Sequence, residues 1–285
     1  PIYQELHREL LKRDVLHGDE TTLQVLKEPG KSAQSKSYMW LYRTGGDAEH
    51  PIVLYDYRPD RKAKNAEEFL EGFSGYLHAD GYQGYHKLRP DIRVVGCWAH
   101  ASRKSDEAVK SLPKKEQAGC TALEGQAFCT KLFAIEAEIQ DLSLEEKRKQ
   151  RQGRAKPVLD ALFSWAEEKR KVTPPKSALG KALHYLKEQR PYLVRYLEDG
   201  RLEISNNRAE RSIKPFVMGR KNWLFANTPA GARASAVIYS LMETAKETGL
   251  DPYKYLLWAL REAPKLFETD REWAKKLTPE HCIQH

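Results

Sequence analysis

The hydrophobic period of the chain changes along its length, and this change limits the fold more than any other feature. Between residues 15 and 57, three segments have the β-rich or alternating pattern of strands, VLHGDETTLQVL, SYMWLYR and PIVLYDY. Turn-forming stretches separate them, which predicts an antiparallel meander. From residue 106 to residue 201 no convincing strand occurs, and apolar residues recur at helical spacing. The pattern therefore predicts an α/β (α+β) core that is interrupted by an all-helical insertion.

Between the meander and the insertion the chain alternates helix and short strand. NAEEFLEGF predicts a helix in which Asn65 is the N-cap and Glu68 completes a capping box. GYLHAD (75–80) predicts a short strand that ends at an acid, and RVVGCWAH (93–100) predicts a further strand that runs into a helix. The expected order over this part of the chain is β-β-β-α-β-turn-β-α.

The C-terminal third predicts mainly helices with clear ends. PAGARASAVIYSLMETAKETG predicts a long helix that stops at Gly249, and Asp251 and Pro252 form an N-cap and first-turn pair for the next helix. RKNWLF before them predicts a short extended segment. We expect five parts: 1–14 the end of an upstream helix or linker, 15–105 the first part of the core, 106–201 the helical insertion, 202–248 the second part of the core, and 249–285 a helical tail.

The charge balance points to an anionic partner. The chain of 285 residues carries 48 Lys+Arg against 40 Asp+Glu, a formal net charge of +8, and nucleic acid is the commonest partner of a soluble protein this basic. A basic globular enzyme whose charge only keeps it soluble is the alternative. The four cysteines form no CxxC pair, so we expect no zinc ribbon or disulfide framework and a reducing, cytoplasmic setting. No apolar run is long enough to cross a membrane, and the first residues predict a piece of a longer protein.

Three carboxylates stand where a metal site would need them. Asp19 and Asp80 each interrupt a predicted apolar strand, which costs desolvation unless a cation or hydrogen bonds meet the charge. Glu210 lies in SNNRAERSIK, a single acid within a basic cluster. Three such acids form an oxygen-only site suited to Mg²⁺ or Mn²⁺. The alternatives are a hydrogen-bonding strand-end residue for Asp19, a turn residue for Asp80 and a capping-box partner of an Asn207 N-cap for Glu210.

A resemblance to a known family favours the metal site. GDETTLQVL, GYLHADGYQGY, GCWAHASRK and the long stretch SNNRAERSIKPFVMGRKNWLFANTPAGARASAVIYSLMETAKETGLDPYKYL resemble the catalytic part of DDE transposases of the insertion-sequence-66 (IS66) family. The resemblance implies a ribonuclease-H-like five-stranded mixed sheet flanked by helices, in which the first and fourth strands are neighbours. It also implies that Asp19 is the first D, Asp80 the second D, and Glu210 the E after the helical insertion. The chain departs from the family pattern at Thr22, at Ser102 and in the acidic Asp56.

The resemblance implies an activity and its requirements. It implies metal-dependent cleavage at transposon ends and strand transfer into target DNA, with two Mg²⁺ or Mn²⁺ ions and a homo-oligomeric synaptic complex. The alternatives are a ribonuclease-H-like nuclease that does not join DNA and a non-catalytic DNA-binding protein derived from a transposase.

Several basic and aromatic residues are candidate DNA ligands. The alternative for the basic residues is solvated charge, and the alternative for Trp223 is core packing. His100 is explained equally well as a packed histidine and as a phosphate contact. The candidates are His100, Arg103, Arg208, Arg211, Lys214, Arg220, Lys221, Trp223 and Arg233.

Overall fold

The computed structural model describes residues 1–282 and divides into two compact units, which we treat separately. The first unit contains Pro1–Leu77, Gln83–Arg93 and the chain from Asn207 onward. The second contains His78–Tyr82 and Val94–Asn206. Among the described residues, no helix combines the length and the apolar character needed to cross a membrane.

A five-stranded mixed sheet forms the centre of the core. Its strands are β1 (Val15–Gln24), β2 (Lys36–Thr44), β3 (Val53–Arg58), β4 (Gly75–His78) and β5 (Ile92–Val95), and their order is β3-β2-β1-β4-β5. The first three strands pair antiparallel, which confirms the predicted meander. The order confirms that the first and fourth strands are neighbours and that the fold is of the ribonuclease-H-like α+β type.

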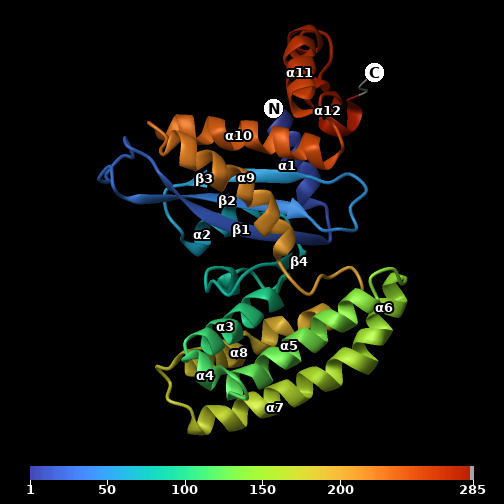
Figure 1. The fold of residues 1–285 in the computed structure, drawn as a ribbon. Coiled ribbons are helices and arrows are strands. Elements are labelled where there is room, and N and C mark those ends of the chain that lie inside the picture. The colour runs from blue at the N-terminus through green and yellow to red at the C-terminus, as the bar shows by residue number, and fades with distance from the viewer. Residues whose placement is uncertain (283–285) are drawn as a thin grey trace. The chain divides into compact units, whose positions relative to one another are not determined.

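Two long helices cover one face of the meander. Figure 1 shows α9 (Asn207–Trp223) and α10 (Pro229–Glu247) lying across β1 to β3. Their apolar residues join Leu23, Met39 and Leu41 of the strands in one buried cluster. Asp19 lies directly opposite Leu41 in the β1–β2 ladder. Directly opposite residues point to the same face of a sheet, so Asp19 faces the side that α9 and α10 cover.

The other face of the meander packs against aromatic residues from shorter elements. These elements are α1 (Ile2–Leu11), α2 (Ala63–Phe69) and the 3₁₀ turn η1 (Tyr85–Lys87). Phe69 stacks on Tyr42 with ring centroids 4.2 Å apart, and Tyr85 meets Trp40 edge-on at 5.7 Å. The first unit ends with α11 (Pro252–Phe267), α12 (Trp273–Lys276) and η4 (Pro279–His281).

Helices make up almost all of the second unit, as the spacing of apolar residues predicted. They are α3 (Trp98–Lys110), α4 (Lys114–Gln117), α5 (Thr121–Glu138), α6 (Leu144–Gln150), a π-helical turn η2 (Arg151–Ala155), α7 (Lys156–Val172), α8 (Ala178–Leu193) and η3 (Arg195–Leu197). Helix α3 packs against α5 and α8, and α7 packs against α5 and α8. Their apolar stripes therefore bury one another.

Some local predictions were right and others were wrong. Gly249 follows α10 with a φ of 79°, and the Asp251 side chain caps α11. The Asn65 capping box is wrong, because α2 already begins at Ala63 and the Asn65 amide instead donates to the carbonyl of Asp60.

Three predicted extended segments are shorter or absent. RKNWLF is not extended up to Trp223, because α9 continues to that residue. The strand predicted at 93–100 ends at Val95, and α3 begins at Trp98. The strand predicted at 75–80 ends at His78, so Asp80 follows a strand and does not interrupt one.

Candidate active site

Asp19 lies in the middle of β1 beside a second acid. Its Oδ1 accepts a hydrogen bond from the Glu20 N–H at 2.8 Å. Glu20 points to the opposite face, where the Tyr85 hydroxyl and Arg61 Nε donate to its carboxylate, each at 2.6 Å. The Glu20 side chain is only 2% exposed. The two adjacent carboxylates thus have different surroundings, and only Asp19 faces the side of α9.

Helix α9 runs along β1 above Asp19. Near its C-terminal end, Arg220 donates to the hydroxyls of Thr21 and Thr22 at 3.3 and 3.2 Å. Toward its N-terminal end, the Ser212 hydroxyl accepts a 2.5 Å hydrogen bond from Arg43. Arg43 pairs with His17 in the β1–β2 ladder, so the helix lies over the part of the ladder between residues 17 and 21 of β1.

Glu210 occupies the first turn of α9. The helix begins at Asn207, so Asn207 is the first helical residue and Glu210 the fourth. The Asn207 N-cap assignment is therefore displaced by one residue. A carboxylate in the first turn is stabilised by the positive end of the helix dipole. Ser212, two residues further on, fixes this turn to the sheet.

A buried arginine and a tyrosine hold this part of α9. Arg43 is 2% exposed and forms an ion pair with Glu247 of α10 at 2.8 Å. Its hydrogen bond holds the pKa of Glu247 below the ordinary value. The Tyr55 hydroxyl donates to the main-chain carbonyl of Ser212. Our sequence reasoning missed these residues, although a charge inside the aromatic strand SYMWLYR was a usable signal for Arg43.

Asp80 lies in the short loop that follows β4 and belongs to the second unit. Its Oδ1 accepts the N–H of Tyr82 at 2.8 Å, which makes the loop an Asx turn. The N–H of Ala79 donates to the carbonyl of Val95 at 3.0 Å and fastens the loop to the end of β5. Because β4 pairs next to β1, Asp80 follows the strand that neighbours the one carrying Asp19.

His100 and Arg103 lie on α3 of the second unit, three residues apart. Arg103 and Asp80 both act electrostatically on the Tyr185 hydroxyl, whose pKa is raised above its ordinary value, mainly by burial. Cys97 precedes the helix, and its Sγ accepts the N–H of Asn206 at 3.1 Å. The candidates of this unit thus gather around the first turns of α3.

The remaining candidates lie in the first unit and differ in exposure. Arg211, Lys214 and Lys221 are exposed along one side of α9, where Met218 is also exposed. We call this set the basic stripe. Arg208 is half-buried in the first turn of α9, and Arg233 is exposed on α10. Arg220 is half-buried against β1. Trp223 packs edge-on against Phe216 at 5.3 Å, as its alternative core interpretation expects.

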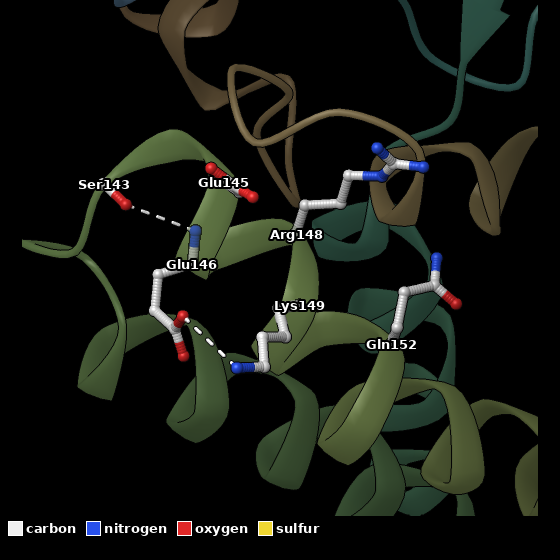
Figure 2. Close-up of a pocket in the computed structure, with 6 residues that line it drawn as sticks. All are labelled: Ser143, Glu145, Glu146, Arg148, Lys149 and Gln152. Atoms are coloured by element: carbon white, nitrogen blue, oxygen red, sulfur yellow. Dashed lines mark hydrogen bonds and ion pairs between the residues drawn. The ribbon is translucent and has the colours of Figure 1, made fainter.

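A groove in the second unit contains none of the candidates. It has a volume of about 470 Å³ and is lined by Ser143, Glu145, Glu146, Arg148, Lys149 and Gln152. Figure 2 shows the Ser143 hydroxyl bound to the N–H of Glu146, whose carboxylate pairs with Lys149 at 4.0 Å. The groove is therefore a mixed-charge surface of α6.

The strand order places the fold in the ribonuclease-H-like class, and the sequence defines the family. The chain belongs to the Transposase IS66 family, whose model matches residues 1–234. This is a DDE transposase family.

Similar proteins occur in Sinorhizobium fredii. The uncharacterized protein y4qI is 34% identical over 253 residues, which are 84% of this chain and 46% of that protein. The uncharacterized protein y4jD is 32% identical over 268 residues, which are 90% of this chain and 51% of that protein. The chain thus spans about half the length of these curated relatives. No solved structure matches the chain.

Proposed function

We propose that the protein carries out DNA transposition by cutting at transposon ends and joining the freed ends to target DNA. Asp19, Asp80 and Glu210 hold two divalent ions, Mg²⁺ or Mn²⁺. The observation that carries the proposal is the placement of Asp19 on the α9-facing side of β1, next to the strand that leads to Asp80. Glu210 belongs to the helix that lies over this part of the β1–β2 ladder.

The donor set fits the proposed ions. All three side chains are carboxylates, and oxygen-only ligands favour Mg²⁺ and Mn²⁺ over softer metals. When bound, two such ions activate the attacking oxygen and stabilise the leaving one during displacement at phosphorus. The role of the protein is to hold Asp19 on β1, Asp80 on the loop that follows β4, and Glu210 on a helix that Arg43 and Arg220 fix to the sheet.

The chemistry consists of two displacements at phosphorus. In the first, water attacks the phosphodiester at the transposon end, the bond to the 3′ oxygen breaks, and a 3′-hydroxyl and a 5′-phosphate result. In the second, this 3′-hydroxyl attacks a target phosphodiester, forms the new bond, and releases the 3′-hydroxyl of the target strand. Each attacking oxygen loses its proton and each leaving oxygen gains one, so neither step needs a redox partner.

The basic stripe and its neighbours supply the DNA contacts. Arg211, Lys214 and Lys221 are spaced so that they share one exposed side of α9. Cations in such a row bind successive phosphates and fix the register of the duplex without reading its sequence. Arg208 and Arg233 extend this surface, while His100 and Arg103 supply contacts from the second unit. A homo-oligomer that holds both transposon ends completes the proposal.

Mn²⁺-dependent thermal stabilisation tests the metal site. An ion that binds only the folded state raises its stability by about 2.7 kcal/mol at a hundredfold excess over Kd. We expect this increment in the wild type and its loss in Asp19→Ala, Asp80→Ala and Glu210→Ala. Glu20→Gln is the matched control, because that acid is adjacent to Asp19 but faces the other side of the sheet. An increment that survives in all three alanine variants would contradict the assignment.

A further inference from the structure

We propose that the helical insertion positions the loop that carries Asp80, through a wall formed by Tyr185 and Gln189 of α8. This inference rests on the proposed function, because it assigns a task to the residues around one of the three acids. It concerns only residues of the second unit. It gives the insertion a role in assembling the metal site, which neither the sequence nor the family membership supplies.

The first support is the close approach of α8 to Gly81, the residue after Asp80. A Cβ added at Gly81 would lie 2.8 Å from the ring carbon Cε2 of Tyr185 and 3.2 Å from Cδ of Gln189. Real Cβ atoms essentially never approach another atom as closely as the first distance. Only glycine therefore allows the loop to lie this close to α8.

A second glycine repeats the arrangement at the next strand. Gly96 follows β5, and its N–H donates to the carbonyl of Tyr192 on α8 at 3.0 Å. A Cβ added there would lie 3.1 Å from the backbone nitrogen of Leu193. Helix α8 thus lies directly against the chain beyond the ends of both β4 and β5.

The wall itself is held in place by other residues of the same unit. Lys104 of α3 lies over the Tyr185 ring, with Nζ 5.1 Å from the ring centroid, a cation–π contact that fixes one face of the ring. Trp98 of α3 donates to the carbonyl of Leu193 at 2.9 Å and so anchors the end of α8. These contacts fix the position of α8 beside the loop.

Gln189 adds a polar element to the wall. Its side chain is 94% buried, since the residue is only 6% exposed, and among the described residues no donor reaches its Oε1. A buried acceptor without a donor destabilises the folded state, and this one lies beside the loop that carries the proposed ligand.

Hydrogen bonds of the loop itself act on Asp80 together with the wall. The Asx turn from Tyr82 to Asp80 sets the carboxylate relative to its own backbone, and one hydrogen bond from Ala79 joins the loop to β5. The side chains of Tyr185 and Gln189 limit how closely the loop can approach α8, so both are positioning residues for Asp80.

A suppressor experiment tests the wall. The Mn²⁺-dependent rise in melting temperature is measured, with a DNA duplex present throughout, for wild type, Gly81→Ala, Tyr185→Ala, the combination of the two, Tyr185→Phe and Asp80→Ala. The metal-free melting temperature reports on folding, and the metal-dependent increment reports on the site. Changes around metal ligands typically weaken metal binding by about 10- to 100-fold, and we expect a loss at the low end of this range for Gly81→Ala.

The informative result is the double variant. Tyr185→Ala alone removes the ring that limits the loop and should weaken Mn²⁺ binding. In the combination with Gly81→Ala the added methyl group takes up part of the space that the ring leaves, so the double variant should bind Mn²⁺ more tightly than either single variant. Tyr185→Phe keeps the ring and should bind as the wild type does. Glu188→Ala, an exposed change on the same helix, is the matched control and should have no effect.

The measurements distinguish an error in the positioning role of Tyr185 and Gln189 from an error in the proposed metal site. If Asp80→Ala abolishes the increment but Gly81→Ala keeps that of the wild type, the wall has no positioning role and the three-acid site stands. If Gly81→Ala loses the increment and the double variant does not recover it, the positioning role of Tyr185 is equally overturned. If the wild type shows no increment, or Asp80→Ala retains it, the proposed metal site itself is wrong.

Discussion

Among the residues that the structure describes, each of the two units contains one buried arginine, and the two have different hydrogen-bond partners. In the first unit, Arg43 binds mainly side chains, those of Ser212 of α9 and Glu247 of α10, and donates to one main-chain carbonyl, that of Thr44, at 3.3 Å. In the second unit, Arg151 binds Glu136 at 2.7 Å and also donates to three main-chain carbonyls, those of Tyr196, Asp199 and Leu202. Acceptor side chains can be replaced together with the arginine that they bind. Main-chain carbonyl acceptors remain in the protein after any substitution of the arginine.

The largest expected effect comes from Arg151→Met. Arg151 is 3% exposed, so the methionine would leave Glu136 and three carbonyls without their donor. We expect a loss of about 4 kcal/mol in the free energy of unfolding, measured by urea denaturation. The segment 196–202 should then become sensitive to proteolysis. A loss of unfolding free energy no larger than the loss caused by Arg43→Met would contradict the difference between the two arginines.

Glu247→Ala is expected to rank second. It leaves the Arg43 guanidinium, which is 2% exposed, without its carboxylate. Removing the partner of a buried charge costs about 3 kcal/mol. Arg43→Met should cost less, about 1 kcal/mol for the lost hydrogen bond to Ser212, because Glu247 lies at the surface and remains hydrated. Urea midpoints that show Arg43→Met as the more damaging change would contradict this order.

The Arg43–Glu247 pair also predicts a dependence on pH. The folded-state pKa of Glu247 is lowered from 4.5 by the hydrogen bond from Arg43. A carboxyl with a depressed pKa contributes stability above its unfolded pKa and loses it as pH falls through the folded value. Melting temperatures should therefore decline below about pH 4.5. The decline should be shallower in Arg43→Met than in the wild type. Identical slopes of melting temperature against pH in the two proteins would show that the Arg43–Glu247 pair does not cause the decline.

The smallest expected effect is a gain in the free energy of unfolding from a substitution of Leu224, which follows the end of α9. Leu224 has a φ of 63°, a left-handed conformation that costs a residue with a Cβ about 1 to 2 kcal/mol. Its side chain is 62% exposed, so truncation removes little burial. Leu224→Gly should raise the free energy of unfolding by about 0.5 kcal/mol after the entropy of the added glycine is counted. Leu142→Gly, an exposed leucine without this strain, is the control and should not stabilise.

The sequence predicted the framework of the site well for a physical reason. Strand period and turn chemistry are local, so the meander, the end of α10 at Gly249 and the cap at Asp251 followed from neighbouring residues. The neighbouring positions of β1 and β4 came from the family resemblance and are confirmed by the strand order.

The predictions that failed depended on contacts that local patterns do not contain. Asn65 has the composition of a cap, but its amide is taken by the carbonyl of Asp60, and the helix starts earlier. The first four residues of RKNWLF belong to α9 because Phe216 and Trp223 pack together on the sheet cluster. The wall at Gly81 joins residues far apart in the chain, and nothing in DGYQGY alone indicates Tyr185.

The central claim is that this chain joins DNA ends with a site built from Asp19, Asp80 and Glu210. The most direct test is a strand-transfer assay with a DNA duplex that ends in the terminal sequence of the mobile element and exposes a free 3′-hydroxyl, with supercoiled plasmid as target and Mg²⁺ or Mn²⁺ present. The account predicts joined products with the wild type and none with Asp80→Ala, although the variant still binds the duplex. Joined products from Asp80→Ala, or plasmid cutting by the wild type without any joining, would contradict it.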